Sequence, residues 1–430
     1  MFSFLSNACP ARLPARAASL CLLLSLLAWS TSGLAAPAAL SLEEAVRMAV
    51  ERAPMLDARR AQVDAARQEF QRAGALPDPM LMVGIDNLPV TGPDAFDPSA
   101  DFMTMKRIGI RQEVPAGAKR EARRDLAART VDERQARARA ERLEIRRSTA
   151  EAWIALWTAE RKLDEVTALR EQAELASDLA RARVAGGSEL AVDALAAKAA
   201  VLELVNRIEA ARAEVEAAQI GLARWIGAPA LHVTADMPDF SELPVQKTRL
   251  LSAVDKVGPL LAAEAQVETA AAAIDLAQAE KRPDWSVAAS YGQRSDGRDD
   301  MFMLEFGVEL PLFTANRQDR GIAARRAEYD AALAVREDAR REQAARIRVD
   351  LAQWEALKRQ VARDRYALLP LAGDRSATAL AAYRAGAPIR PWLDARSDEL
   401  KLVIEHTQRL EALGRSWAAL AYLLAEEPQP

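Results

Sequence analysis

Residues 300–311 alternate between apolar and polar positions. The apolar positions are Phe302, Leu304, Phe306, Val308 and Leu310. The intervening positions carry Glu305 and Glu309, together with two methionines and a glycine. Successive side chains of a β-strand point to opposite faces of the sheet, so this segment predicts a strand with one apolar and one polar face.

Four segments of this kind occur in two pairs, at about 79–115 and 283–313. Each strand has about ten residues, which is the length that crosses a bilayer. Four strands do not close a barrel, since about eight is the smallest workable number, and lipid does not tolerate an open sheet edge. Transmembrane strands would therefore need several chains in one barrel, and three copies supply twelve strands. The alternative is a small sheet whose apolar face packs against a helix.

Long helices are predicted on either side of these strands. Residues 116–184 contain no proline, and their apolar positions recur at helical spacings. A helix of that length spans about 100 Å, which is wider than a globular core. The corresponding segment 314–385 contains Pro370 and Gly373 and should bend or break near the proline, which cannot donate a backbone hydrogen bond.

The chain repeats itself at a spacing of about 200 residues. The phrase "PMLDARRAQVDAA" from Pro54 corresponds to "PLLAAEAQVETAA" from Pro259, and "RQEVP" at Pro115 corresponds to "GVELP" at Pro311. Further along, "RVAGGSELAVDAL" from Arg183 corresponds to "YRAGAPIRPWLDA". Because the matches follow one order, the chain is predicted to contain two structural repeats, at about 41–227 and 250–424.

Each repeat is predicted to have the order helix, strand, strand, long helix, turn and returning helix. The first helices are expected over 42–75 and 250–281. Glycine turns end the long helices, which places hairpin tips near 184–193 and 384–394.

Residues 1–36 have the features of a secretory signal. Arg12 and Arg16 precede the apolar run 20–29, and small residues follow up to Ala36. Both cysteines fall in this segment, and neither follows a small-residue box suited to acylation, so no lipid anchor and no disulfide are expected in residues 37–430. The net charge of −4, without a basic block, argues against a nucleic-acid partner.

The order of elements and several phrases resemble the TolC-like family of outer-membrane efflux factors. The phrases are "GIRQEVP" and "GVELPLF" after the strand pairs, "ALLPLAGDRSATALAAYRAG" before the second tip and "LDA" after it. The resemblance implies a mainly α protein whose homotrimer forms a twelve-stranded outer-membrane β-barrel, continued by a long periplasmic α-helical barrel. It also implies two partners, a periplasmic adaptor (membrane fusion protein) and an inner-membrane pump of the resistance-nodulation-division type.

The phrases "LPDPM", "DFMTMKRIGI" and "LFTANRQDRGI" are similar to the heavy-metal branch of this family. Relatives often carry two aspartates before "LDA" at the second tip, whereas here only Asp394 remains, with Arg390 and Pro391 nearby. Candidate residues for a gate at the periplasmic tips are Asp193, Tyr383, Arg384, Arg390 and Asp394.

Six methionines form three M-x-M pairs in the strand segments, in phase with the polar face. These candidate channel-lining residues are Met80, Met82, Met103, Met105, Met301 and Met303. Thioethers are soft ligands suited to Cu(I) and Ag(I), and methionine also serves simply to fill space. The sequence leaves both interpretations open. Met103, Met105, Met301 and Met303 are expected at the outer mouth, and Met80 and Met82 at the base of the barrel.

Other chemistry has little support in the sequence. The two histidines, His232 and His406, have no partner at metal-ligand spacing, and neither a phosphate loop nor a nucleophile elbow occurs. We therefore expect neither an enzyme nor a cofactor. Two function classes remain: an exit duct of a tripartite efflux system, or a soluble periplasmic coiled-coil adaptor. A duct would carry metal ions, drugs or a secreted protein.

Overall fold

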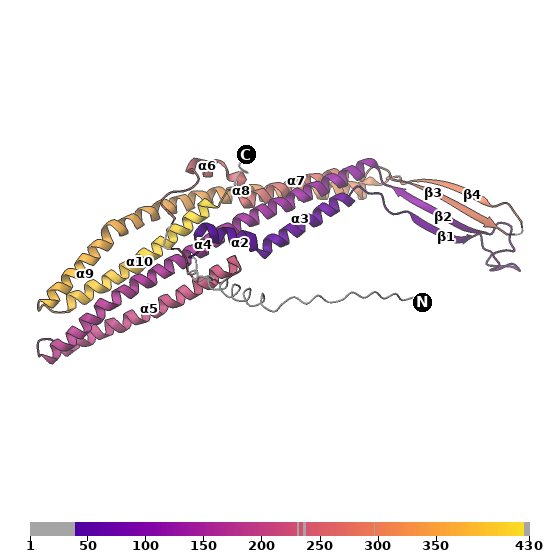
Figure 1. The fold of residues 1–430 in the computed structure, drawn as a ribbon. Helices are drawn as coiled ribbons and strands as arrows, with labels where there is room; N and C mark the ends of the chain where they lie inside the picture. Colours follow the sequence, from indigo (N-terminus) through magenta and orange to yellow (C-terminus); the bar gives the residue numbers. More distant parts are fainter. Residues whose placement is uncertain (1–38, 230–231, 235–237, 296, 425–430) are drawn as a thin grey trace, which may run out of the picture.

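The computed structural model describes residues 39–424 except 230–231, 235–237 and 296. The chain is elongated, with two helical hairpin tips at one end and a β-sheet at the other (Figure 1). The predicted signal segment 1–36 lies outside the described residues.

The first repeat follows the predicted order of elements. Its elements are α2 (Leu42–Arg52), α3 (Pro54–Arg72), β1 (Met80–Asp86), β2 (Met105–Val114), α4 (Gly117–Ala185) and α5 (Ala191–Ile226). The 69 residues of α4 match the predicted proline-free helix to within one residue at each end.

The second repeat runs through the same order, with short additional turns. Its elements are α6 (Lys247–Ser252), η1 (Val254–Lys256), α7 (Gly258–Ala279), β3 (Trp285–Arg294), β4 (Met301–Val308), η2 (Thr314–Asn316), α8 (Gln318–Arg363), η3 (Asp364–Leu368), α9 (Leu369–Arg384) and α10 (Arg390–Ala421). The fold is therefore mainly helical and built from a duplicated unit, as the sequence predicts.

The first helix of each repeat is broken, which corrects the prediction of continuous helices over 42–75 and 250–281. Ala53 is extended, with φ −68° and ψ 113°, because Pro54 begins α3 and disfavours a helical residue before it. In the second repeat Val257 is extended at φ −75° and ψ 147°, and Pro259 lies in the first turn of α7. Proline therefore starts a new helix in both repeats.

The second long helix is interrupted where the sequence predicts it, near Pro370. The interruption is a single π-helical turn, η3, in which the amide of Leu369 donates to the carbonyl of Asp364. The buried Asp364 carboxylate accepts a 2.7 Å hydrogen bond from Arg409 of α10, and His406 lies 3.5 Å from the same oxygen. A proline-induced register change is thus held by a buried ion pair.

Three tryptophans fix the connecting segments around the middle of the helices. The indole N–H groups of Trp153, Trp354 and Trp417 donate to backbone carbonyls of Leu40, Phe240 and Glu242, at 2.7–2.9 Å. All three rings belong to one buried core, which joins the two repeats. A second buried core lies nearer the tips and includes Tyr383, Ile389 and Trp392.

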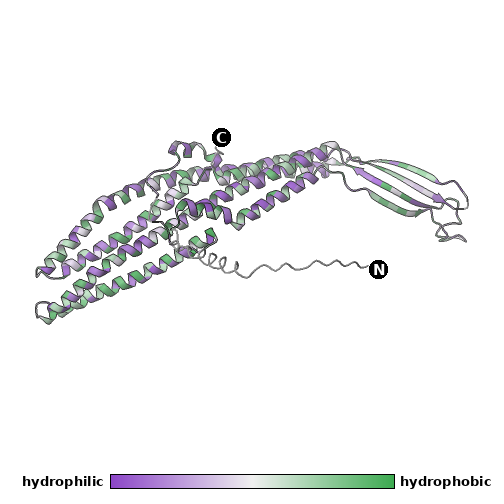
Figure 2. Cartoon of the chain, in the orientation of Figure 1, coloured by the Kyte–Doolittle hydropathy of each residue, from purple (hydrophilic) through white to green (hydrophobic). Residues whose placement is uncertain are grey.

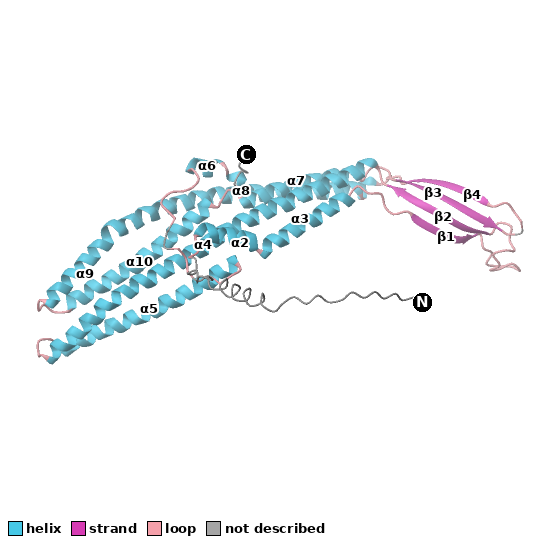
Figure 3. Cartoon of the chain, in the orientation of Figure 1, coloured by secondary structure: helices cyan, strands magenta, loops and turns pink. Residues whose placement is uncertain are grey.

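The four strands form one antiparallel sheet in the order β1-β2-β3-β4. The sheet extends beyond the end of the helices, and no described helix covers either of its faces (Figure 3). Among the described residues, β1 and β4 each lack a strand partner on their outer side.

Asp284, immediately before β3, joins the sheet to the helices. Its carboxylate accepts 2.8 Å hydrogen bonds from the Ala116 amide and from the Lys119 ammonium group. Burial acts to raise the pKa of Asp284, but the hydrogen bonds from Lys119 and Ala116 outweigh it and hold the pKa below its usual value. The stability that this pair contributes is present above the unfolded-state pKa of about 3.9 and is lost as pH falls through the lower folded-state value.

Asp284→Asn is expected to lower the free energy of unfolding at pH 7 by about 2–3 kcal/mol, because it leaves the Lys119 charge, whose side chain is only 9% exposed, without its partner. Thermal unfolding of the purified protein measures this change. Asp78→Asn is the matched control, since Asp78 holds the equivalent place in the first repeat but is exposed. Equal losses in both variants would contradict a specific role for the pair.

Candidate functional site

The register of the sheet separates an apolar face from a polar face. Residues paired across antiparallel strands lie on the same face, and one such row joins Val83, Ile108, Tyr291 and Phe302. The large side chains of this face are exposed, with 75% for Val83, 72% for Phe302 and 68% for Phe306. Figure 2 shows hydrophobic stretches, in green, along the strands. The alternative prediction, in which a helix covers the apolar face, is wrong.

The opposite face carries paired charges. Arg107 of β2 lies 3.0 Å from the Asp86 carboxylate of β1, and Arg111 lies 3.4 Å from the Glu305 carboxylate of β4. Met80, Met82, Met105, Met301 and Met303 share this face by register. The sheet is therefore amphipathic across all four strands.

Two of these methionines meet over a glycine. A Cβ placed on Gly292 would stand 2.8 Å from the Met105 sulfur and 3.4 Å from the Met303 methyl group. Met301 is directly opposite Gly292 on β4. Met105 begins β2 and Met301 begins β4, both at the end of the sheet farthest from the helices, whereas Met80 begins β1 at the end nearest to them (Figure 1). Met303 lies one row further in than Met301, on the row that also contains Met82.

Met103 does not belong to the sheet, which corrects the prediction of three M-x-M pairs on one face. β2 begins at Met105, and Met103 lies in the preceding turn, where its amide donates to the Asp101 carboxylate at 2.6 Å. The Thr104 hydroxyl then donates to the Asn87 carbonyl at 2.8 Å. These side-chain bonds hold residues 101–104 out of the strand ladder.

Glycine-centred turns close both helical hairpins at the opposite end of the molecule. Gly187 has φ +72° and Gly386 has φ +110°, values that L residues with a side chain rarely adopt. After each glycine the next amide bonds back to the helix, from Ser188 to Arg183 and from Ala387 to Ala382. The two predicted tips are thus ordinary helix C-termini with tight turns.

The two tips are tied together by three side chains. The Tyr383 hydroxyl donates a 2.8 Å hydrogen bond to the Glu189 carboxylate of the first tip. The Arg183 guanidinium donates to the Tyr383 carbonyl at 2.9 Å and stands 4.7 Å from the Tyr383 ring centre. The Tyr383 residue and the Glu189 side chain are almost fully buried. We call Arg183, Glu189 and Tyr383 the tip clamp.

The Tyr383 phenol of the tip clamp keeps its proton near neutral pH. Burial raises the pKa of Tyr383 to about 12, and its hydrogen bond to Glu189 acts in the same direction. The phenol therefore stays protonated, and its contribution to stability is complete below the unfolded-state pKa of about 10. It is lost only as pH rises through the folded-state value.

Tyr383 makes its hydrogen bonds within its own chain, and its predicted part in a gate between chains stays a prediction. Arg384, Arg390 and Asp394 are exposed, and Asp193 is half-buried in the first turn of α5. Within the described residues no ion pair joins these four side chains to one another. Arg183 and Glu189 were not among the predicted tip residues, although Arg183 occupies the place of Tyr383 in the first repeat.

The sheet and the tips belong to a fold that known proteins share. The family model described as outer membrane efflux protein matches residues 45–228 and 258–426, which is most of the chain. The chain belongs to the outer membrane efflux protein family. No curated protein sequence matches it.

Solved structures share the fold of this efflux protein. A membrane protein from Pseudomonas aeruginosa has a TM-score of 0.74 at 20% identity, over 88% of this chain and 90% of that one. CusC has a TM-score of 0.73 at 16% identity, over 89% and 92% of the two chains. VceC of Vibrio cholerae has a TM-score of 0.71 at 20% identity, over 88% and 96%. Family membership favours the duct over the periplasmic adaptor.

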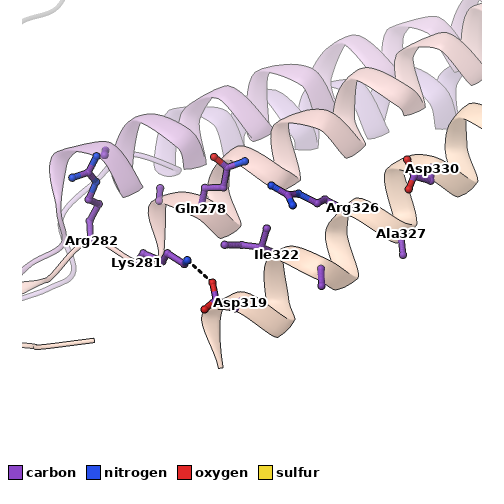
Figure 4. A pocket seen from close by; sticks show the side chains of 11 residues that line it. Gln278, Lys281, Arg282, Asp319, Ile322, Arg326, Ala327 and Asp330 are labelled. Atoms are coloured by element: carbon purple, nitrogen blue, oxygen red, sulfur yellow. Dashed lines mark ion pairs between the residues drawn. The ribbon is translucent and has the colours of Figure 1, made fainter. Parts of the chain in front are cut away.

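A large groove lies near the junction of the helices and the sheet. It has a volume of about 980 Å³ and lies between the end of α7, the start of α8 and Ala118 of α4. Figure 4 shows the ion pair between Lys281 and Asp319 at its edge. The remaining wall consists largely of alanines and arginine stems, which gives the efflux protein an open surface between helices.

The described residues of this efflux protein contain neither a membrane-spanning helix nor a cluster of conventional metal ligands. None of the helices is both long and apolar enough to cross a membrane. In the same part of the chain, no three histidine, cysteine, aspartate or glutamate side chains gather as a metal site.

Proposed function

We propose that the protein is the outer-membrane exit duct of a tripartite efflux system. Three copies share one twelve-stranded barrel, and their helices form a periplasmic tunnel. A periplasmic adaptor and an inner-membrane pump of the resistance-nodulation-division type deliver the cargo. Residues 1–36 direct export, and the tunnel begins at the hairpin tips.

One observation carries this proposal: the sheet has an uncovered apolar face and two unpaired edges. An exposed hydrophobic sheet with open edges is an aggregation hazard in water. In a bilayer the same face contacts lipid, and pairing of β1 with β4 of the next copy satisfies both edges. The polar face, with its paired arginines and carboxylates, then lines the duct.

The helices of a single chain also leave apolar surface uncovered. Along the first hairpin these exposed residues are Leu175, Leu190, Val192, Leu195 and Leu202, each more than half exposed. Val192, Leu195 and Leu202 are spaced as on one side of a coiled-coil helix. Neighbouring copies would cover this stripe in a helical tunnel.

The tip clamp supports a closed resting state of the duct. It holds the second hairpin against the first within each chain, through a buried carboxylate and a buried phenol. The exposed Arg384, Arg390 and Asp394 and the half-buried Asp193 remain proposed gate residues at the same end. Opening requires the two hairpins to separate, which breaks the bonds of Arg183 and Glu189.

The proposed cargo is a heavy-metal ion. The polar face of the sheet presents thioethers, which are soft ligands, on the wall that the cargo would pass. A multidrug or protein-secretion duct is the second candidate, because the same architecture passes any cargo that fits the tunnel.

Metal tolerance of a strain that contains the cognate pump and adaptor tests this proposal. Deleting the gene for this chain is expected to raise sensitivity to silver and copper, and restoring the full chain is expected to reverse it. Sensitivity to a neutral drug is the comparison. Loss of drug tolerance with unchanged metal tolerance would favour the second candidate, and no change in either would contradict an efflux role.

A further inference from the structure

We propose that Met105, Met301 and Met303 form a binding site for a soft monovalent ion, Cu(I) or Ag(I), on the polar face of the sheet. Each chain holds one complete site, in the half of the sheet that is farther from the helices. The inference deepens the proposed function, on which it rests, by assigning a cargo-binding position within the duct.

Gly292 creates the space for this site. It is paired with Met301 on β4 and with Arg107 on β2, and it presents no side chain on the polar face. The Met105 and Met303 side chains approach from the two neighbouring strands and end over the same glycine, at the 2.8 and 3.4 Å given above. The Met105 sulfur and the Met303 methyl group therefore meet over Gly292, and Met301 lies beside them on β4, directly opposite the glycine.

The chemistry of the gap favours a soft cation over a hard one. Thioether sulfur binds Cu(I) and, by the same softness, Ag(I). Mg²⁺ prefers oxygen donors, and protein ligands of Zn²⁺ are thiolate, imidazole or carboxylate groups, none of which lies among these three methionines. The charge of neighbouring Arg107 is compensated by Asp86 at 3.0 Å. Arg294, which faces Met105 across the strand pair, donates to the Asp299 carbonyl at 2.9 Å. Neutral ligands without a carboxylate give a site that an ion leaves easily, as conduction requires.

The other methionines of the strand segments lack this arrangement. Met103 lies in a turn outside the sheet. Met80 is 58% exposed at the opposite end of the sheet, and Met82 is paired with Gly109, where a Cβ would meet Ser290 rather than a sulfur. Met80 and Met82 are therefore matched controls on the same face.

Titration of the purified, detergent-solubilised full chain with Ag(I) tests the site. The protein carries methionines labelled with ¹³C in the methyl group, and calorimetry gives affinity and stoichiometry. We expect saturable binding of one Ag(I) per chain, with shifts confined to the methyl signals of the three methionines. Zn²⁺ in the same titration is expected to produce no such shifts.

Three variants distinguish a specific ion site from non-specific binding of Ag(I) to methionines along the polar face. Substitution of Met105, Met301 and Met303 by leucine should abolish saturable binding. Gly292→Ala keeps every sulfur but displaces that of Met105, and should weaken binding by about tenfold, as other indirect changes at metal sites do. The variant M80L/M82L should bind as the unchanged protein does.

Two results would overturn the site: absence of saturable Ag(I) binding in the unchanged protein, or retained binding in the triple leucine variant. Equal weakening in M80L/M82L would also overturn it, because binding would then be spread along the face. Single-channel conductance in planar bilayers is measured on the same samples. If the protein conducts but does not bind Ag(I), the methionine site is contradicted and the proposed duct is not. If the protein binds Ag(I) but does not conduct, the proposed duct is contradicted and the methionine site is not.

Discussion

Replacing Phe306 with arginine is expected to prevent accumulation of the assembled protein in the outer membrane. Phe306 lies two residues before the end of β4, on the uncovered apolar face, and is 68% exposed. A charged side chain facing lipid costs about 2–4 kcal/mol near the middle of a bilayer, and every copy in the barrel would carry it. The assembled form is measured by its altered mobility in unheated gels of outer-membrane extracts.

Met303→Arg on the same strand is the matched control. Met303 is on the polar face, and an arginine there stands two residues from Glu305, with which it can pair. This variant is expected to assemble as the unchanged protein does. Equal assembly of the Phe306→Arg and Met303→Arg variants would contradict the assignment of faces, and so would failure of both.

The second large effect is expected at the tips, where Arg183→Ala should raise single-channel conductance in planar bilayers. The substitution removes the hydrogen bonds to the Tyr383 and Ala387 carbonyls, at 2.9 and 3.4 Å, and the stacking on the Tyr383 ring. It also removes the cation 3.7 Å from the buried Glu189 carboxylate. An uncompensated buried charge costs about 3–5 kcal/mol, which would favour separation of the hairpins.

Arg181→Ala controls for the loss of a positive charge near the tip. Arg181 is two residues away, but its side chain is 69% exposed and pairs only with Asp178 of the same helix, at 3.5 Å. Exposed pairs of this kind contribute less than about 1 kcal/mol. Conductance of this variant should stay unchanged. If both variants behave alike, the tip clamp does not hold the duct closed.

Features governed by local pattern could be predicted from the sequence. The alternation in β4 identified its two faces because side-chain direction in a strand has a period of two, and the observed register agrees. The limits of α4 followed from an unbroken helical composition between Pro115 and the glycine pair at 186–187. The break near Pro370 followed from the missing amide of proline, although the π-turn itself was not foreseen.

Features that depend on distant contacts or on competing local bonds were missed. The breaks before Pro54 and Pro259 were overlooked because the helical pattern continues on both sides of each proline. Met103 keeps the strand alternation, yet a bond from its amide to Asp101 excludes it from the ladder. The tip clamp joins residues about 200 positions apart, and only the repeat places Arg183 and Tyr383 at equivalent points.

The mass of the intact assembly tests the central claim, that three copies complete one duct, most directly. The full chain is extracted from outer membranes in mild detergent, and its mass is measured by native mass spectrometry. The account predicts a single species of three chains, because neither sheet edge is paired by another described segment of the same copy. A protein recovered only as a single chain, or only from the soluble periplasmic fraction, would contradict it.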